Sequence, residues 1–304
     1  MTAIPRILVL VALAAAPQPV AAEGSEEAAS FTGPLAQNLQ GVGSKLIALA
    51  DAIPAEKYSW RPTPDVRSVS EVLMHVVGGN LTLLADLGGG APEGVEIGST
   101  VWDLARQRKQ WEEEIVDKAT VVEMLKQSFI YAVETIPLIT DLDDEVATWG
   151  FPASKRTYLL ILQGHAHEHL GQTIAYTRYL GITPPWSRRP EPVVAESVAT
   201  FEGSSARADI GSIDGFGNLA TTFVTSDLEK IGIELGDRIA VEACGGRAEA
   251  LFAKELFDVR PGEWVAFISP AGHLIVAISY GSAAETLGCS QPEAIVLRPA
   301  ESSV

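Results

Sequence analysis

The spacing of apolar residues changes once along this chain of 304 residues, and that change constrains the fold more than any other feature. From about residue 31 to residue 182, apolar residues recur at the three- and four-residue spacing of an α-helix. From about residue 208 onwards, β-rich runs are separated by Asp-Gly, Gly-Gly, Pro-Gly and Ala-Gly turn signals. We therefore expect a multidomain α + β protein, with an antiparallel four-helix bundle followed by a small β-barrel or sandwich domain.

The first part of the chain predicts four long helices joined by connections that contain Gly and Pro. Ser68, followed three residues later by Glu71, is typical of a capping box at the start of the second helix. A further helix with a charged face is expected at Val101–Val116. The four long helices are expected at Leu35–Ile53, Val69–Leu87, Val121–Ile139 and Thr157–Leu180.

The second part predicts a compact β domain at residues 208–304 with one short helix, Ser282–Leu287. Its strands are expected at Ala220–Thr225, Arg238–Ala243, Ala248–Ala253, Trp264–Ile268, Leu274–Ser279 and Ala294–Leu297. Between the two parts, residues 184–207 are rich in Pro, Ser, Glu and Arg, which predicts a linker. The helical domain then occupies residues 23–183.

The chain carries a formal net charge of −17, and both parts contribute to it. An acidic surface repels a phosphate backbone and an anionic membrane, so we expect no nucleic acid as a partner. Beyond the first residues no stretch is predicted to span a membrane. The acidity also agrees with a simpler role, which is to keep the protein in solution.

The first residues predict an export signal at residues 1–22. Arg6 supplies the positive start, Ile7–Ala16 is a short apolar run, and Val20-Ala21-Ala22 offers small residues for cleavage near Ala22. We therefore expect a periplasmic or secreted protein. In such an oxidising compartment Cys244 and Cys289 can form a disulfide, but two small buried thiols fit the sequence equally well.

The segment from Gly164 to Gln172 contains three of the five histidines of the chain. On an α-helix His165 and His169 lie on one face, which is the spacing by which one helix offers two imidazoles to one metal ion. His167 points elsewhere, and His75 is the best-placed third ligand. The alternative is a set of buried, hydrogen-bonded histidines that bind no metal.

Three polar residues near these histidines have two interpretations each. Glu168 directly precedes His169 and is expected to point away from the metal face, as a solvated or packing carboxylate. Asn80 either supports the ligands or caps its own turn. Arg178 either meets an anionic substrate or lies on the surface, and the sequence reveals no general base.

The helical part carries a set of motifs that extends from about Leu35 to Pro185. The motifs are Trp60-Arg61-Pro62, Val66-Arg67-Ser68-Val69 leading to His75 and Asn80, His165-x-x-x-His169-x-Gly171-Gln172, and Tyr179-Leu180-Gly181-Ile182-x-Pro184-Pro185. With these motifs the chain resembles the DinB-like superfamily of metal-binding four-helix bundles. The resemblance implies a divalent metal ion, zinc or nickel, bound by His75, His165 and His169. It also implies a hydrolase or a thiol-dependent transferase.

The β part carries Ile213-Asp-Gly-Phe-Gly-Asn-Leu219, Ser269-Pro-Ala-Gly-His-Leu274 and Gly281-Ser-Ala-Ala284. From about Ala208 to Pro299 it is similar to the C-terminal domain of the S-adenosylmethionine hydroxide adenosyltransferases. This resemblance implies a nucleoside pocket at a trimer interface. The ligand residues it implies are Asp214, Phe216, Asn218, Ser269 and Ala283. The alternative for residues 214–218 is a tight turn in which the glycines adopt positive φ and the phenylalanine fills the barrel.

The β part also departs from that family, since Thr222 and Ile275 replace the usual asparagine and acidic residue. The family's larger catalytic domain is replaced by the helical part, so hydrolysis or halogenation of S-adenosylmethionine is not expected. The first functional hypothesis is an exported metalloenzyme acting on a small molecule. The second is a non-catalytic protein that binds a nucleoside or an S-adenosylmethionine-like molecule through its β domain, and the third is a metal-binding or stress-response protein without turnover. A homo-oligomer is expected, as a dimer or a trimer.

Overall fold

The structure is a computed structural model that describes residues 24–92, 95, 101–148, 151–187, 199–291 and 293–300. The chain divides into two compact units, Met1–Leu180 and Gly181–Val304, called here the helical unit and the β unit. The expected signal peptide at residues 1–22 lies outside the described residues. The expected order of a helical part followed by a β part is confirmed.

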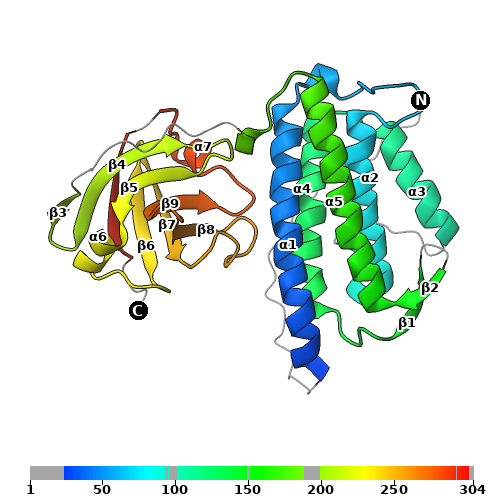
Figure 1. Ribbon diagram of the computed structural model, residues 1–304, viewed down its shortest axis with the longest axis horizontal. Coiled ribbons are helices and arrows are strands. Elements are labelled where there is room, and N and C mark those ends of the chain that lie inside the picture. Colours follow the sequence, from blue (N-terminus) through cyan, green and yellow to red (C-terminus); the bar gives the residue numbers. More distant parts are fainter. Residues whose placement is uncertain are drawn as a thin grey trace. The chain divides into compact units, whose positions relative to one another are not determined.

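The helical unit contains five α-helices among its described residues (Figure 1). They are α1 (Gly24–Ala52), α2 (Val69–Leu84), α3 (Val101–Glu114), α4 (Lys118–Thr135) and α5 (Lys155–Tyr179). Short 3-10 turns follow α1 at Ala55–Lys57 and α4 at Ile136–Leu138, and a π turn continues α2 at Ala85–Gly89. The predicted capping box forms as expected, with the Ser68 hydroxyl accepting from the Glu71 amide and the Glu71 carboxylate accepting from the Ser68 amide.

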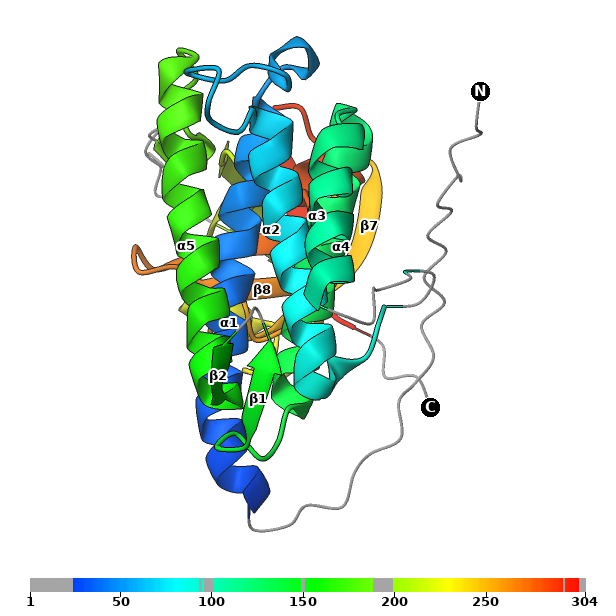
Figure 2. The same ribbon diagram turned by 90° about the vertical axis from the view of Figure 1, so that its right-hand side faces the viewer.

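Helices α1, α4, α2 and α5 pack as a ring in which each contacts the next, and α3 packs against α2 (Figures 1 and 2). The described part of the helical unit therefore contains more than the four α-helices of a four-helix bundle, because α3 is a fifth α-helix beside the ring. The extra helix expected at Val101–Val116 corresponds to α3. The helical unit also contains a two-stranded antiparallel hairpin of β1 (Glu145–Thr148) and β2 (Phe151–Ser154), which was not expected from the sequence.

Helix α2 is enclosed by three neighbours, α3, α4 and α5. Fourteen of its sixteen residues are buried, and the exceptions are Glu71 and His75. A helix that is apolar on all sides is stable in water only at the centre of a core. The position of His75 on the most buried helix means that its imidazole is held by packing from several sides.

Helix α2 and its π turn, Val69–Gly89, are long and apolar enough to cross a membrane by length and composition. In the structure 72% of that apolar stretch is buried within the protein. The same length and apolarity are expected of the central helix of a packed core.

The β unit is a closed barrel of seven strands with an eighth short strand at its edge. The barrel strands are β4 (Ser205–Ile213), β5 (Leu219–Val224), β6 (Arg238–Ala243), β7 (Gly246–Phe252), β8 (Trp264–Ile268), β9 (His273–Ile278) and β10 (Ala294–Pro299). Their order is β4-β5-β9-β8-β7-β6-β10, and β10 pairs back onto β4 with Leu297 opposite Ala206. All neighbours are antiparallel except β7 and β8.

Inward side chains alternate with outward ones along the strands and fill the barrel with an apolar core. A smaller apolar cluster forms around Val265 and Ala277. Two short helices, α6 (Thr225–Lys230) and α7 (Ala283–Leu287), complete the unit. The structure corrects the expected linker at 184–207, because β3 (Thr200–Glu202) and the first residues of β4 lie within that range. Residues 188–198 of the expected linker lie outside the described residues.

Candidate metal centre

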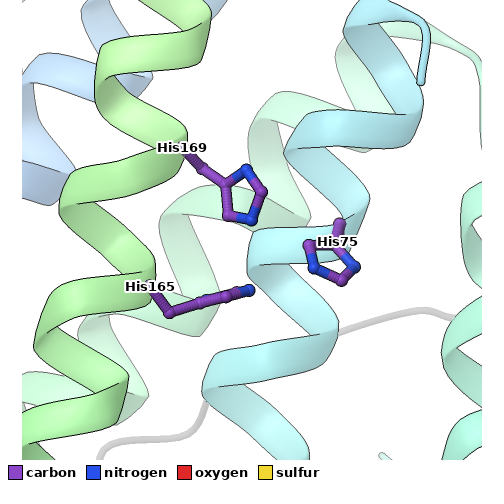
Figure 3. Close-up of side chains that lie close together, drawn as sticks. All are labelled: His75, His165 and His169. Carbon is purple, nitrogen blue, oxygen red and sulfur yellow. The ribbon is translucent and has the colours of Figure 1, made fainter. Parts of the chain in front are cut away.

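Three histidines from two helices converge inside the helical unit. His75 comes from α2, and His165 and His169 come from α5 (Figure 3). One potential ligand atom of each imidazole lies within 4.8 Å of the others. The ring centroids are 4.9 Å apart for His75 and His165, 4.8 Å for His75 and His169, and 4.6 Å for His165 and His169. We call these residues the histidine triad.

The four-residue spacing on α5 sets this geometry. Ser154 caps the start of α5 through its hydroxyl, which accepts from the Thr157 amide, and the helix then runs unbroken past both ligands. His169 is buried and His165 is half-buried, whereas His167 and Glu168 are exposed. The His167 ring forms a hydrogen bond of 2.9 Å with Asn38 Oδ1. As expected from the sequence, His167 and Glu168 point away from the triad.

A glycine on α2 makes room for His165. A Cβ atom at Gly79 would lie 2.6 Å from His165 Cε1 and 3.0 Å from its Nδ1. Glycine in the middle of a helix costs about 1 kcal/mol relative to alanine. That cost is offset here by the close approach of the imidazole to the α2 backbone.

A carboxylate from α3 fixes the orientation of His75. Glu112 Oε1 lies 2.7 Å from His75 Nδ1, and its other oxygen, Oε2, accepts from Arg67 Nε at 2.7 Å. Hydrogen bonding at Nδ1 leaves the other nitrogen, Nε2, of His75 as the atom that could bind a metal ion, as in metal sites where a ligand histidine pairs its other nitrogen with a carboxylate. Glu112 was not among the candidate residues predicted from the sequence.

A second chain of hydrogen bonds fixes His169. Its Nδ1 pairs with Gln172 Oε1 at 2.8 Å, and Gln172 Nε2 donates to the Tyr176 hydroxyl at 3.0 Å. The Tyr176 hydroxyl in turn donates to the backbone carbonyl of Arg67 at 3.0 Å. Arg67 therefore connects both chains, since its side chain reaches Glu112 and its backbone reaches Tyr176. We call this set of five hydrogen bonds the Arg67 circuit.

The surroundings disfavour the protonated form of the two α5 histidines. Burial, assisted by the charges of the other two histidines and of Arg108 and Arg67, lowers the pKa of His165 from 6.5 to about 3. Burial also lowers the pKa of His169, although the hydrogen bond with Gln172 opposes that shift. A neutral imidazole is the form that binds a metal ion.

Glu112 is ionised in this environment. Burial alone would raise the pKa of its carboxyl group, but the hydrogen bonds and charges of His75 and Arg67 outweigh burial and lower it. Three converging imidazoles, two of them oriented through Nδ1, form a donor set of the kind that holds zinc and related divalent cations. The residues present therefore fit the divalent metal ion that was expected from the sequence.

An open cleft of about 640 Å³ lies beside the triad. His75 and Gln172 line it, together with Arg61, residues 64–67 and the face of α3 that includes Arg108 and Glu112. The cleft thus places part of the donor set next to a space large enough for a small molecule.

Comparison with protein families agrees with this geometry. Residues 38–173 match the family model described as the DinB superfamily. Residues 208–296 match the model described as the SAM hydroxide adenosyltransferase C-terminal domain. The chain joins a DinB domain to an adenosyltransferase-type β domain. The DinB superfamily is typically metal-binding, which agrees with the histidine triad.

Several solved structures are also similar to parts of this chain. A DinB-like protein from Bacillus cereus ATCC 10987 shares 18% identity, with 54% of this chain and 95% of that one covered and a TM-score of 0.36. An uncharacterized conserved protein from Thermotoga maritima shares 20% identity over 45% of this chain and 49% of that one, with a TM-score of 0.33. A conserved hypothetical protein from Thermus thermophilus shares 25% identity over 42% of this chain and 47% of that one, with a TM-score of 0.24.

The chain thus spans about half the length of the Thermotoga and Thermus proteins. With these TM-scores, none of the three structures adds to what the family models establish. No curated protein was found to be similar to the chain.

Two other candidate residues of the helical unit, Asn80 and Arg178, have surroundings that suggest structural roles. Asn80 is fully buried, and its amide donates to Ser128 Oγ at 3.2 Å, which ties α2 to α4. Arg178 is exposed near the end of α5. These contacts support a packing role for Asn80 and a surface position for Arg178.

In the β unit, Asp214 and Asn218 bond to each other. Asp214 Oδ1 accepts from the amides of Phe216 and Asn218 at 2.8 and 2.9 Å, and Asp214 Oδ2 accepts from the Asn218 side chain at 2.9 Å. The Phe216 ring stacks with Trp186, with centroids 6.0 Å apart and planes inclined by 10°. These contacts favour the tight turn over a ligand pocket for residues 214–218.

The two remaining candidates of the β unit have structural contacts as well. The Ser269 hydroxyl, in the turn between β8 and β9, accepts from the His273 amide at 3.3 Å. Ala283 is fully buried at the start of α7, next to Ser282. Gly217 has a φ of 78°, and a Cβ atom there would overlap Ser282 Oγ, so this glycine is required where the turn meets α7. The structure also joins Cys244 and Cys289 by a disulfide bond.

We predict that Glu112→Ala lowers the affinity of the helical unit for a divalent metal ion by about tenfold, because His75 loses the partner that orients it. Competition with a chromophoric chelator measures this affinity. Glu114→Ala is the matched control, because Glu114 is exposed on the same helix and bonds only to Gln110 in the described hydrogen bonds. Equal affinities for the two variants would contradict the role assigned to Glu112.

We also predict that the metal-free protein loses stability as the pH falls below 6.5. The pKa of His165 is about 3 in the fold but near 6.5 in the unfolded chain, so between these values the unfolded state binds a proton that the folded state does not. Stability therefore decreases with falling pH through this window. Urea unfolding at pH 7.5, 6 and 4.5 measures the trend, and His165→Gln is expected to flatten it.

Proposed function

We propose that this protein is an exported, divalent-metal-dependent enzyme that acts on a small molecule, either as a hydrolase or as a thiol-dependent transferase. In this proposal His75, His165 and His169 hold one zinc or nickel ion. The observation that carries the proposal is the convergence of three imidazoles within 4.8 Å beside an open cleft.

Each part of the site has a separate role in this proposal. A divalent cation held by three neutral imidazoles keeps at least one coordination position for water or a thiol and lowers the pKa of the group that binds there. Glu112 and Gln172 hold His75 and His169 in the binding orientation and tautomer. The cleft admits the substrate from solvent on the side of His75.

Two observations support export and an oxidising compartment. The apolar N-terminal run has the length and flanking residues of a signal peptide. The Cys244–Cys289 disulfide is of the kind that persists outside the cytoplasm. In this proposal the β unit contributes oligomerisation or substrate specificity, and S-adenosylmethionine is not hydrolysed.

Elemental analysis of the purified full chain tests the metal site. We expect near-stoichiometric zinc or nickel in the wild type and almost none in the His165→Ala/His169→Ala variant. His167→Ala is the matched control, because His167 is exposed on the same helix and bonds to Asn38 instead. Metal that persists in the double variant, or a wild type that cannot be loaded, would overturn the proposal.

An activity screen tests the enzymatic part. The metal-loaded wild type is offered small esters and amides, and electrophiles with and without a low-molecular-weight thiol. Turnover is expected to disappear in the double variant and to remain in His167→Ala. A fully loaded protein that turns over none of these classes would restrict the proposal to metal binding.

A further inference from the structure

The backbone carbonyl of Arg67 fixes the direction of each hydrogen bond between it and His169. A carbonyl oxygen can only accept, so the Tyr176 hydroxyl, 3.0 Å away, donates its one proton to it. The Tyr176 oxygen then accepts from the amide nitrogen of Gln172, and this turns the Gln172 oxygen towards His169. An amide oxygen cannot donate, so His169 carries its proton on Nδ1 and keeps a free electron pair on Nε2.

The side chain of Arg67 acts on the other helix in the same sense. A guanidinium can only donate, so Glu112 Oε2 accepts from Arg67 Nε at 2.7 Å. The second oxygen of this ion-paired carboxylate, Oε1, accepts from His75 Nδ1 at 2.7 Å. The Glu112 side chain is only 13% exposed, so protein groups rather than water determine its orientation. His75 therefore also carries a proton on Nδ1, which leaves Nε2 for a metal ion.

The loop around Arg67 is held on both sides of this residue. The preceding carbonyl, that of Val66, accepts from Arg61 Nη1 at 3.0 Å. The following amide, that of Ser68, donates to Glu71 Oε2 at 2.8 Å, and the other oxygen of Glu71 pairs with Arg61 Nη2 at 2.6 Å. The capping box of α2 and the Arg61–Glu71 pair thus fix the backbone of Arg67 independently of the histidines.

The neighbouring histidine of α5 has the opposite arrangement. His167 Nε2 lies 2.9 Å from Asn38 Oδ1, which also accepts from Gln163 Nε2 at 2.9 Å. An amide oxygen only accepts, so the proton of His167 is on Nε2. Two histidines of one helix therefore carry their protons on different ring nitrogens, and the difference follows from their partners.

We propose that Arg67 is the common positioning residue of two metal ligands, His75 and His169. Its side chain orients His75 through Glu112, and its carbonyl sets the proton of His169 through Tyr176 and Gln172. Both imidazoles then offer Nε2, although they come from different helices. This inference rests on the proposed metal site for its purpose but not for its geometry, because the hydrogen bonds join protein atoms alone.

Nuclear magnetic resonance tests the proton positions in the absence of metal. Long-range ¹H–¹⁵N spectra of the histidine-labelled full chain, freed of metal by a chelator at pH 8, report which ring nitrogen carries the proton. His75 and His169 are expected to carry it on Nδ1, and His167 is expected to carry it on Nε2 in the same spectrum. A proton on Nε2 of His169, or exchange between its two nitrogens, would overturn the inference.

Tyr176→Phe breaks the chain to His169 by removing one oxygen atom. The Gln172 amide loses its acceptor and can rotate, so His169 is expected to populate the form with the proton on Nε2, while His75 keeps its signal. The affinity for Zn²⁺ should fall about tenfold. Tyr179→Phe is the matched control, because Tyr179 is 81% exposed on the same helix. A proton position at His169 that does not change in Tyr176→Phe would contradict the proposed chain.

Variants of Arg67 test its side chain by competition of the full chain with a chromophoric chelator for Zn²⁺. Arg67→Met keeps the apolar stem without a donor and is expected to lower the affinity about tenfold. Arg67→Lys keeps one donor for Glu112 and is expected to recover part of that loss. Arg106→Met is the control, because Arg106 is exposed on α3 and pairs with Asp103 instead. Wild-type affinity in Arg67→Met would overturn the role of the side chain.

A double-variant cycle decides whether one residue serves both ligands. Glu112→Ala breaks the chain to His75, and Tyr176→Phe breaks the chain to His169. If Arg67 supports both, the first break loosens the second chain, so the double variant should lose at least about threefold less affinity than the product of the single losses. Losses that multiply would overturn the common role of Arg67.

Failure of the wild type to bind either Zn²⁺ or Ni²⁺ would instead overturn the proposed function. The proton positions measured without metal distinguish that failure from a failure of the hydrogen-bond chains. Protons on Nδ1 of both His75 and His169, together with losses that do not multiply, are the result that supports the inference.

Discussion

Gly79→Ala is expected to lower the affinity for a divalent metal ion by more than about a hundredfold, although none of the three histidines is altered. The new Cβ atom would lie 2.6 Å from His165 Cε1, so the imidazole must swing away from α2 and leave the triad. Loss of one of three ligands exceeds the usual effect of a residue that only supports a ligand, which is about tenfold to a hundredfold. A chelator competition assay on the full chain measures this change.

The same substitution is expected to leave the fold as stable as before, or to stabilise the metal-free form. Alanine is favoured over glycine in a helix by about 1 kcal/mol, and the side chain that must move is a single imidazole. Gly171→Ala is the matched control on α5, where a Cβ atom meets no other atom within 4 Å. It should gain helix stability and keep its metal. Unchanged metal affinity in Gly79→Ala would show that His165 is not a ligand.

Removal of the disulfide is expected to destabilise the β unit by about 2–4 kcal/mol. Cys244 lies in the turn between β6 and β7, and Cys289 follows α7, at a sequence separation of 45 residues. A crosslink over that distance restricts the unfolded chain considerably. The double variant Cys244→Ser/Cys289→Ser removes this restriction and leaves the barrel to its apolar core.

Hydrogen exchange followed by mass spectrometry measures this effect separately for peptides of each unit. We expect faster exchange in the barrel strands of the double variant and unchanged exchange in α2 and α5. Metal content should not change, because the whole triad belongs to the helical unit. Wild-type protein treated with a reductant is the control and should reproduce the variant. A loss of stability below about 0.5 kcal/mol would show that the barrel does not depend on this bond.

The histidine triad was predictable because most of its information is local. His165 and His169 are four residues apart on one helix, and the resemblance to the DinB superfamily supplied His75. The Arg67 circuit was not predictable in the same way, since Glu112 reaches His75 only because α3 packs on α2. The sequence marks Glu112 only as one of several acidic residues on a charged helix.

Strands were predicted where bulky apolar residues mark them, as in β8 and β10. Strand β4 was missed because its buried face carries Ala206, Ala208, Ile210 and Ser212, and small side chains give little contrast between the two faces. The hairpin of β1 and β2 was missed for a related reason. Each of its strands has four residues, and only Thr148 is buried among those described.

The pairing of β4 with β10 has a consequence for how the β unit folds. The barrel closes only when its first long strand meets its last one, after every strand between them is in place. Contacts between distant segments slow folding, because the entropy of a long loop is lost before those contacts form. The helices of the helical unit, in contrast, form through hydrogen bonds between residues that are four apart in the sequence. Refolding of the full chain is therefore expected to proceed in two kinetic phases, with the helices forming first and closure of the barrel limiting the overall rate.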